Sequence, residues 1–435
     1  MAKKLWGGRF KKETDKDFFK FQKSIQYDYK LALYDIHHSF IHISALKKAG
    51  ILTEEERQKL HSALTGISKE IKENKFKPNL KSEDIHTEIQ TRVEKKIGSL
   101  SYKLHTLRSR NDQIAFDEKN YCGFEGCNIA DCLLEVISAL KYLGAKYKGL
   151  HMPGYTHTQR AQKIAFADYL AAFESMFARD KGRLDAFTDK LVIYIGSGAF
   201  KGTSLSKEYD AAAKEYLKKM DSQYIALVKN APDNVSDRDF IIELLSALSI
   251  LQMHLSRFSE DMILFSTKEF NFVDLPEEFC TGSSLMPHKK NPDFLELVRG
   301  YTGRIYGNLM ALLTTMKGLP LTYNRDMQLD KEPLFSSVEI IKDELKILAK
   351  FIKGIKLNQE VIKKALEDES LYTVDLAEYL VKEKKVPFAQ AHEIVGRLIR
   401  YSEDNKCKIK EIAEKSLKKI SECLDKKTIK KIFNA

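Results

Sequence analysis

One segment of the sequence, CTGSSLMPHKKNPDFLEL at residues 280–297, is unusually dense in reactive side chains. Pro287 and Pro292 keep it from forming a helix, and Gly282 can act as a hinge. A serine hydroxyl is a poor base in water, but a closing loop would exclude water and set an ammonium group beside the developing alkoxide. This composition favours a mobile catalytic loop over an ordinary surface turn. Its functional groups belong to Ser283, Ser284, Lys289, Lys290 and Asn291.

A second polar cluster lies in KLHTLRSRNDQ at residues 103–113. It brings guanidinium, hydroxyl and amide donors together on Arg108, Ser109, Arg110 and Asn111. The forked donors of arginine match the two oxygens of a carboxylate, so the cluster is suited to capturing an acidic substrate. A salt-bridged helix cap would explain the same residues equally well, and this segment alone does not decide between the two.

A third segment, MPGYTHTQRAQ at residues 152–162, contains a Pro-Gly turn and precedes a predicted helix. We expect Thr156 and His157 to lie near the positive end of that helix, where anions are favoured. A histidine in such a field tends to be neutral and can accept or relay a proton. A single histidine is more often structural, so His157 needs support from the other segments.

The nine prolines leave long stretches of the sequence free of helix breakers, and we expect long helices there. These helices would position the three loops. The clearest pattern, 239–267, has apolar residues on more than one face and predicts a helix surrounded by other helices. Further helices are predicted at 84–97, 117–150, 162–190, 294–316 and 334–356. We therefore expect an all-α chain of three domains. These are an N-terminal helical domain (1–110), a central bundle of five long helices (111–356) that contains the mobile loop 280–292, and a C-terminal helical domain (357–435).

The composition excludes several classes of protein. With only 21 glycines and 9 prolines in 435 residues, an all-β fold is unlikely to form. The six cysteines form no CxxC pair and have no histidine at zinc-ligand spacing, so we expect no metal site, no disulfide framework and a cytoplasmic location. We find no signal peptide and no run of about 18 apolar residues, and so expect no membrane partner.

The net charge of +11 is concentrated in part at the C-terminus, where ten lysines lie between residues 406 and 431. Apolar residues recur among them at helical spacing, and no aromatic residues are interleaved in the manner of a nucleic-acid arm. We interpret the tail as the solvated face of amphipathic helices and expect no nucleic-acid partner. The apolar positions are Ile409, Ile412, Leu417, Ile420 and Leu424.

Taken together, the three loops resemble the signatures of the fumarase/aspartase superfamily of lyases, in which GSSLMPHKKNP is similar to the mobile catalytic loop. Within it, further segments look like the argininosuccinate lyase family, and they span most of the chain in the expected order. These are LWGGRF at 5–10, SEDIH at 82–86, RSRNDQ at 108–113, PGYTHTQRAQ at 153–162, VSDRDF at 235–240 and YNRDMQLDKEPLF at 323–335.

The resemblance implies β-elimination of argininosuccinate to arginine and fumarate, without metal or organic cofactor. A base must remove a proton from the carbon beside a carboxylate, cations must hold the resulting aci-carboxylate, and an acid must protonate the departing guanidino nitrogen. By resemblance, Ser283 would be the base and Lys289 would stabilise both its alkoxide and the carbanion. His157 would be the group on the acid side, oriented by Glu296.

The resemblance also implies a set of substrate-binding residues and an assembly. The central helices of four chains would pack into one bundle, and each active site would be shared between three chains of a homotetramer. The implied binding residues are Ser24, His86, Ser109, Arg110, Asn111, Thr156, Asn291, Tyr323, Gln328 and Lys331.

Four residues near the implied site depart from the family pattern: Leu107, Phe116, His288 and Leu329. Leu107 stands where glycine is usual, and if its φ is positive it costs roughly 1 to 2 kcal/mol of strain.

Two alternatives to an active argininosuccinate lyase remain. One is a lyase that releases fumarate from another adduct, and the other is a catalytically silent, crystallin-like homologue. The retained base, acid and cation favour an active enzyme.

Overall fold

The computed structural model describes residues 11–218 and 225–433, so the LWGGRF segment lies outside the described residues. The chain divides into two compact units. The first comprises Met1–Glu135, Phe177–Ser256 and Leu297–Ile347, and the second comprises Val136–Met176, Arg257–Glu296 and Leu348–Ala435. The boundary between them falls inside five long helices. The division into three domains at residues 110 and 356 stays a prediction.

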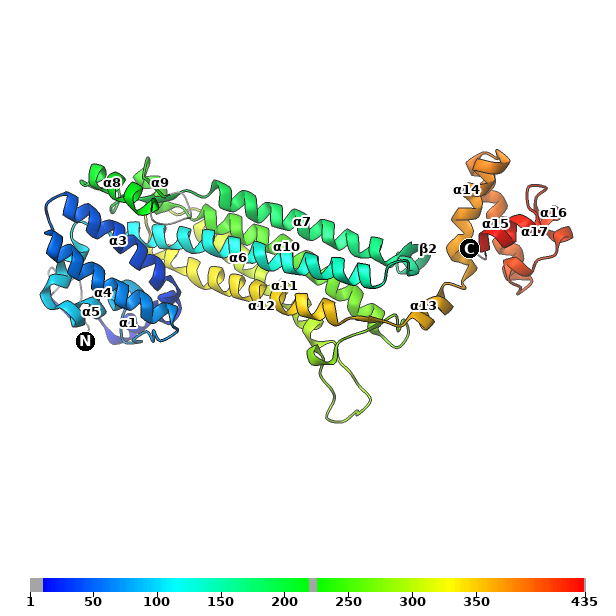
Figure 1. The fold of residues 1–435 in the computed structure, drawn as a ribbon, viewed down its shortest axis with the longest axis horizontal. Coiled ribbons are helices and arrows are strands. Elements are labelled where there is room, and N and C mark those ends of the chain that lie inside the picture. Colours follow the sequence, from blue (N-terminus) through cyan, green and yellow to red (C-terminus); the bar gives the residue numbers. More distant parts are fainter. Residues whose placement is uncertain (1–10, 219–224, 434–435) are drawn as a thin grey trace. The chain divides into compact units, whose positions relative to one another are not determined.

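Five long helices form the framework, as the sequence predicts (Figure 1). Four of them begin and end within four residues of their expected ranges, whereas the helix expected at 117–150 begins seven residues earlier, at Arg110. Their bounds are α6 Arg110–Lys146, α7 Phe166–Lys190, α10 Asp239–Ser266, α11 Asp293–Met316 and α12 Lys331–Gly354.

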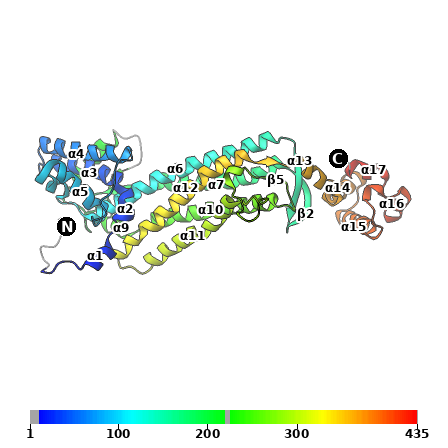
Figure 2. The same cartoon turned by 90° about the horizontal axis from the view of Figure 1, so that it is seen from below.

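Within the first unit, α10 contacts helices on two sides. His254 Nδ1 lies 2.6 Å from Asp180 Oδ2 on α7. Gln252 Nε2 donates to the Val298 carbonyl on α11 at 2.8 Å. Buried leucines of α10 include Leu244, Leu248 and Leu251, and the neighbouring helices are visible in Figure 2. The prediction that this helix is surrounded by others is confirmed.

In length and composition, α10 resembles a membrane-spanning helix, with a mean hydropathy of 1.3 over its most apolar window. It is the sole helix of this kind within residues 11–218 and 225–433. However, 56% of that window is already buried against protein, and Gln252 and Ser259 are buried with it. These features are those of the core helix of a bundle.

The rest of the first unit is a set of shorter helices with two paired strands. A capping box of Thr53 and Glu56 begins α4, since each side chain accepts from the backbone N–H of the other. The helices are α1 Lys16–Gln22, α2 Ile25–Asp28, α3 Ala32–Lys48, α4 Glu54–Lys72, α5 Ile85–Ile97, α8 Ser206–Leu217 and α9 Ala231–Ser236, and the strands are β3 Ile193–Ile195 and β4 Ile225–Leu227.

The second unit contains an antiparallel hairpin of β1 (His151–Thr156) and β2 (Gln159–Ala165). The expected helix start at residue 162 is therefore wrong: α7 begins at Phe166. The position of His157 beside the N-terminus of that helix is wrong for the same reason. Strand pairing, which joins Thr156 to Gln159 and Pro153 to Lys163, satisfies backbone groups that a helix would otherwise use.

The C-terminal helices of the second unit enclose their own apolar core. They are α13 Gln359–Ala365, α14 Thr373–Lys384, α15 Phe388–Asp404, α16 Glu414–Ile420 and α17 Lys426–Phe433, and a short pair of strands, β5 Val273–Asp274 and β6 Lys356–Leu357, precedes them. Ile409, Ile412, Leu417 and Leu424 are buried in this core, while most of the tail lysines are exposed. The interpretation of the Lys-rich tail as a solvated amphipathic face is confirmed.

A buried carboxyl on α12 makes the stability of the first unit depend on pH. Glu344 is 5% exposed, and burial raises its pKa to about 8 from an ordinary value of 4.5. Between pH 4.5 and 8 the folded chain keeps a proton that the unfolded chain releases, so stability falls as pH rises through this window. A tenfold change in proton affinity is worth about 1.4 kcal/mol.

We predict that Glu344→Gln is more stable than the parent protein at pH 8.5, by a few kcal/mol, and equally stable at pH 4.5. Chemical denaturation at the two pH values measures the difference. The matched control is Asp343→Asn, which removes an exposed carboxylate from the same helix. A stability gain that is the same at both pH values would show that ionisation of Glu344 is not its cause.

Candidate active site

The loop 280–292 is fastened at its base and free at its tip. The N–H of Asn291 donates to the Thr281 carbonyl at 2.8 Å, and that of Thr281 donates back at 3.3 Å. Thr281 Oγ1 also donates to Asp293 Oδ2 at 2.6 Å, which joins the loop to the first turn of α11. The loop itself extends away from the helices (Figure 1). The neck is therefore suited to be a hinge for the residues that it carries.

Ser283 lies half-buried in this loop and accepts two backbone hydrogen bonds at its hydroxyl oxygen. The donors are the N–H groups of Met286, at 3.0 Å, and Leu285, at 3.3 Å. Both bonds strengthen when the oxygen becomes negative, so they favour the alkoxide over the hydroxyl. Lys289 is exposed on the same loop, and Lys290 is tied to Asp274 at 2.7 Å.

His157 and Thr158 form the two-residue turn that connects β1 and β2. Their φ angles are +53° and +58°, the left-handed values that a type I′ hairpin turn requires. These angles are uncommon for residues other than glycine, and for a β-branched threonine they are strained. The turn exposes His157, and Thr156 precedes it at the end of β1.

Glu296 lies in the first turn of α11 and is exposed. All four residues to which a catalytic role is assigned by resemblance thus belong to the second unit. Among the described residues, no hydrogen bond joins Glu296 or Ser283 to His157 within one chain. The orientation of His157 by Glu296 stays a prediction.

In the first unit, the structure brings together three predicted binding segments that are distant in sequence. Ser24 Oγ donates to Asp28 Oδ2 at 2.6 Å, and the other oxygen of Asp28 accepts the N–H of Ile85 at 3.1 Å. Arg110 pairs with Asp84, the residue that caps α5. Burial and the charge of Asp84 raise the pKa of Asp28 to about 6.

His86 is held by a buried carboxylate next to this cluster. Its Nδ1 lies 2.9 Å from Asp35 Oδ1, which also accepts the Gln113 amide at 2.7 Å. Asp35, His86 and Asp117 each place one possible metal-ligand atom within 4.8 Å of the others. The buried guanidinium of Arg108 acts on both carboxylates, and burial raises the pKa of Asp117 well above its usual value. Positive charge for the group is thus already supplied by the chain.

A glycine-rich loop that the sequence analysis missed supports Asn111. Asp112 accepts the N–H groups of Gly196, at 3.1 Å, and Ser197, at 3.0 Å. The Asn111 amide in turn donates to the Ala199 carbonyl at 3.2 Å. The signal that could have located this loop is the spacing of three glycines in GSGAFKG, all of which have positive φ: Gly196, Gly198 and Gly202.

Lys331 lies in a buried ion network rather than on a surface. Its Nζ is 2.6 Å from Glu118 and 2.8 Å from Asp330, and Arg238 bridges the same two carboxylates at 3.0 and 2.7 Å. Burial would lower the pKa of Lys331, but the carboxylates outweigh it and raise the pKa. Two cations and two carboxylates thus balance in a site closed to water.

Tyr323 and Gln328, also predicted to bind substrate, are half-buried just before the start of α12. Gln328 Nε2 donates to the Gln22 carbonyl at 2.6 Å, which ties the segment to the chain just before Ser24. Burial raises the pKa of the Tyr323 hydroxyl. The structure therefore places Ser24 and Gln328 on neighbouring segments of the first unit. Ser109 Oγ accepts the N–H of Asn111 at 3.2 Å.

Models of known protein families match most of the chain. A family model described as lyase matches residues 8–307, and one described as argininosuccinate lyase C-terminal matches residues 371–435. The chain is 44% identical to an argininosuccinate lyase of Caldanaerobacter subterraneus, over 97% of this chain and 94% of the relative. It is also 44% identical to that of Carboxydothermus hydrogenoformans, over 99% and 93% of the two chains.

Solved structures share the fold at lower identity. A variant of EDDS lyase with bound fumarate superposes with a TM-score of 0.79 and 21% identity, over 98% of this chain and 85% of the other. A protein described as fumarate lyase:delta crystallin from Brucella melitensis gives 0.78 and 19%, over 95% and 91%. The class II fumarase of Schistosoma mansoni gives 0.76 and 17%, over 93% and 89%. The all-α fold expected from the sequence is confirmed.

The expectation that Leu107 is strained is borne out by its backbone, since φ is +56° just before Arg108. Its side chain is 56% exposed and therefore contributes little packing. We predict that Leu107→Gly stabilises the protein by about 0.5 to 1 kcal/mol, because glycine relieves the strain but adds entropy to the unfolded chain.

Thermal and chemical denaturation measure this change. Leu80→Gly is the matched control, since Leu80 is 57% exposed and is not among the positive-φ residues of the described chain. The control should lose stability while the Leu107 variant gains it. Equal losses in both variants would contradict the assignment of strain to Leu107.

Proposed function

The chain belongs to the argininosuccinate lyase family, and on that basis we propose that it cleaves argininosuccinate to arginine and fumarate. It is a carbon–nitrogen lyase. The observation that carries the proposal is the 44% identity to argininosuccinate lyases over nearly the full length of both chains. The catalytic loop, the hairpin turn and the RSRNDQ segment are all retained within that length.

In the proposed mechanism, Ser283 removes the proton from the substrate carbon next to a carboxylate. The two N–H groups that donate to its oxygen, and the ammonium of Lys289, offset the negative charge of the alkoxide that acts as base. Lys289 then also stabilises the aci-carboxylate formed when the proton leaves. Exclusion of water by the closing loop strengthens each of these interactions.

The carbon–nitrogen bond breaks as the electron pair of the carbanion forms the double bond of fumarate. The departing guanidino nitrogen takes up a proton, and we assign this step to His157, directly or through water. Exposure of His157 at the tip of a hairpin supports this role, because an incoming substrate can reach it. Glu296 would orient the imidazole.

Substrate binding is proposed for groups of both units. The pairing of Ser24, Arg110 and His86 with buried or half-buried carboxylates supports a preorganised carboxylate pocket in the first unit. We include Lys331, whose ammonium is held in place by Glu118 and Asp330. The full set comprises Ser24, His86, Ser109, Arg110, Asn111, Thr156, Asn291, Tyr323, Gln328 and Lys331.

We propose a homotetramer in which each active site draws on three chains. Five large apolar side chains exposed along α11 support this assembly, since exposed apolar surface marks interfaces. Between these residues, the Cβ positions of Gly300, Gly303 and Gly307 have no neighbouring atom within 4 Å. We further propose a cytoplasmic location, which the six free cysteines support. The exposed apolar residues of α11 are Leu297, Tyr301, Tyr306, Met310 and Leu313, which are 39% to 62% exposed.

We predict that Ser283→Ala abolishes measurable release of fumarate and that His157→Asn lowers turnover by ~10²- to 10⁴-fold without dissociating the assembly. Ultraviolet absorbance of fumarate measures turnover, and light scattering measures the assembly. Adenylosuccinate serves as the second substrate, because release of fumarate from it alone would identify the protein as a sister lyase. A near-normal rate for His157→Asn would remove that residue from the mechanism.

We predict that activity returns when the inactive Ser283→Ala and His157→Asn proteins are dissociated, mixed and reassembled. Some sites of a mixed tetramer would take Ser283 and His157 each from a chain that retains it. The control mixes Ser283→Ala with Lys289→Met, since both changes damage the same loop and no site can escape them. Mixed tetramers that stay inactive in both cases would place each site within one chain.

A further inference from the structure

We propose that Arg160 and Asp368 are positioning residues that fix the His157–Thr158 turn against the C-terminal helices. The assignment rests on the proposed role of His157. Neither residue needs to touch the substrate. Their ion pair would act by holding the hairpin in the one arrangement from which the imidazole reaches the leaving nitrogen.

The turn needs such support because its backbone is strained. Two successive residues without glycine have φ values above +50°, and one of them, Thr158, is β-branched. Strained conformations persist only where the surroundings hold them in place. Strand pairing of Thr156 with Gln159 supplies part of this support, but it does not fix the hairpin relative to the rest of the unit.

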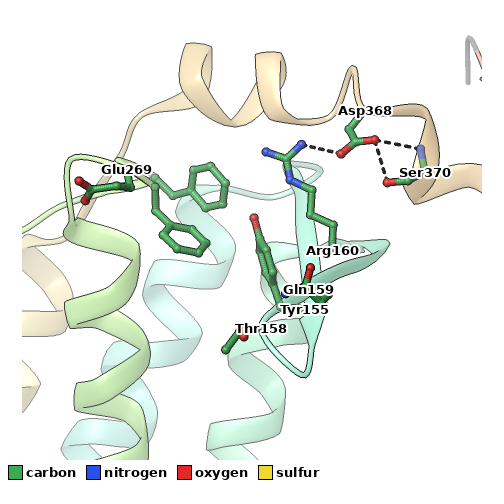
Figure 3. A pocket seen from close by; sticks show the side chains of 9 residues that line it. Tyr155, Thr158, Gln159, Arg160, Glu269, Asp368 and Ser370 are labelled. Atoms are coloured by element: carbon green, nitrogen blue, oxygen red, sulfur yellow. Dashed lines mark hydrogen bonds and ion pairs between the residues drawn. The ribbon is translucent and has the colours of Figure 1, made fainter. Parts of the chain in front are cut away.

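Arg160, two residues after the turn, makes a polar contact that ties the hairpin to the rest of the second unit. Its Nη1 donates to Asp368 Oδ2 at 2.7 Å and approaches the Ala365 carbonyl at 3.4 Å. Asp368 is itself fixed, because its other oxygen accepts the N–H of Ser370 at 3.0 Å and its hydroxyl at 2.7 Å. Figure 3 shows the guanidinium extending from β2 toward this carboxylate.

The hairpin also packs against the C-terminal helices, since β2 contacts the 3₁₀ helix Glu369–Tyr372 and β1 contacts α13. A cavity of about 480 Å³ lies beside the hairpin, and its lining includes Tyr155, Arg160, Glu269 and Phe270. Figure 3 shows Glu269 across this cavity from Tyr155 and Arg160. Tyr155 contacts Phe270 beside this cavity, at 5.4 Å between ring centres. The ion pair adds a polar link between the hairpin and the C-terminal helices next to the cavity.

The ion pair also ends on a rigid support. Asp368 directly precedes the short 3₁₀ helix Glu369–Tyr372, and Leu371 and Tyr372 belong to the apolar core of the C-terminal helices. A second contact also joins β2 to the C-terminal core, since Lys163 Nζ lies 5.2 Å from the centre of the Tyr372 ring. The C-terminal core thus sets the position of the strand that carries the catalytic turn.

The test measures fumarate release from argininosuccinate by Arg160→Gln, Asp368→Asn and the double variant. A displacement of about 1 Å can cost up to ~100-fold in rate, so we expect a fall of about 10-fold in kcat with KM nearly unchanged. The double variant should be no slower than either single variant, because each change breaks the same bond. Arg160→Lys, which keeps a charged donor, should recover most of the rate.

Glu378→Gln is the matched control, since it breaks an exposed ion pair to Lys382 in the same unit and should keep the full rate. Hydrogen exchange of residues 151–165 provides a readout that needs no turnover, and it should accelerate in both single variants. The proposal fails if the wild-type protein is active but the variants keep its kcat, or if exchange is unchanged. An inactive wild-type protein with accelerated exchange in the variants would instead overturn the proposed function alone.

Discussion

The proposed chemistry depends on holding negative charge on the oxygen of Ser283 long enough to remove a proton from carbon. Two backbone N–H groups already point at this oxygen, and an ammonium group lies six residues further along the same loop. All of these groups sit on a loop whose neck is fastened by the Thr281–Asn291 bridge and by bonds to Asp293 and Asp274. The base is thus assembled within a few residues, and closing the loop delivers it as one piece.

The remaining structure handles charge in the opposite way, by pairing it before any substrate arrives. Arg110, His86 and Lys331 each lie against a buried or half-buried carboxylate, so each enters binding with its position already fixed. Burying such groups is costly unless they are paired, which explains why acidic residues lie beside Arg110 and Lys331. The proposed pocket is therefore preorganised in the first unit, while the residues proposed to react are half-buried or exposed in the second. A β-elimination needs both properties, a rigid hold on carboxylates and a mobile base.

The sequence allowed much of this to be predicted, and the failures have physical causes. Four of the five long helices were predicted to within four residues, because the apolar spacing of segments such as 239–267 has one periodicity and no glycine or proline. The start of α6 was missed by seven residues, because its first turn consists of the polar residues of the RSRNDQ segment. The hairpin at 151–165 was missed, because its type I′ turn uses His157 and Thr158 in place of the usual Asn-Gly. The carboxylate partners Asp28, Asp84 and Asp112 could not be assigned from the sequence, since they depend on contacts between distant segments.

The most direct test of the central claim is an experimental structure of the assembled protein with fumarate bound and the loop 280–292 closed. We expect Ser283 Oγ and Lys289 of one chain to contact the ligand. The remaining contacts should come from His157 of a second chain and Asn111 of a third. A ligand bound in this pocket with Ser283 beyond hydrogen-bond or van der Waals reach, while the loop is ordered over the site, would contradict the assignment of the base.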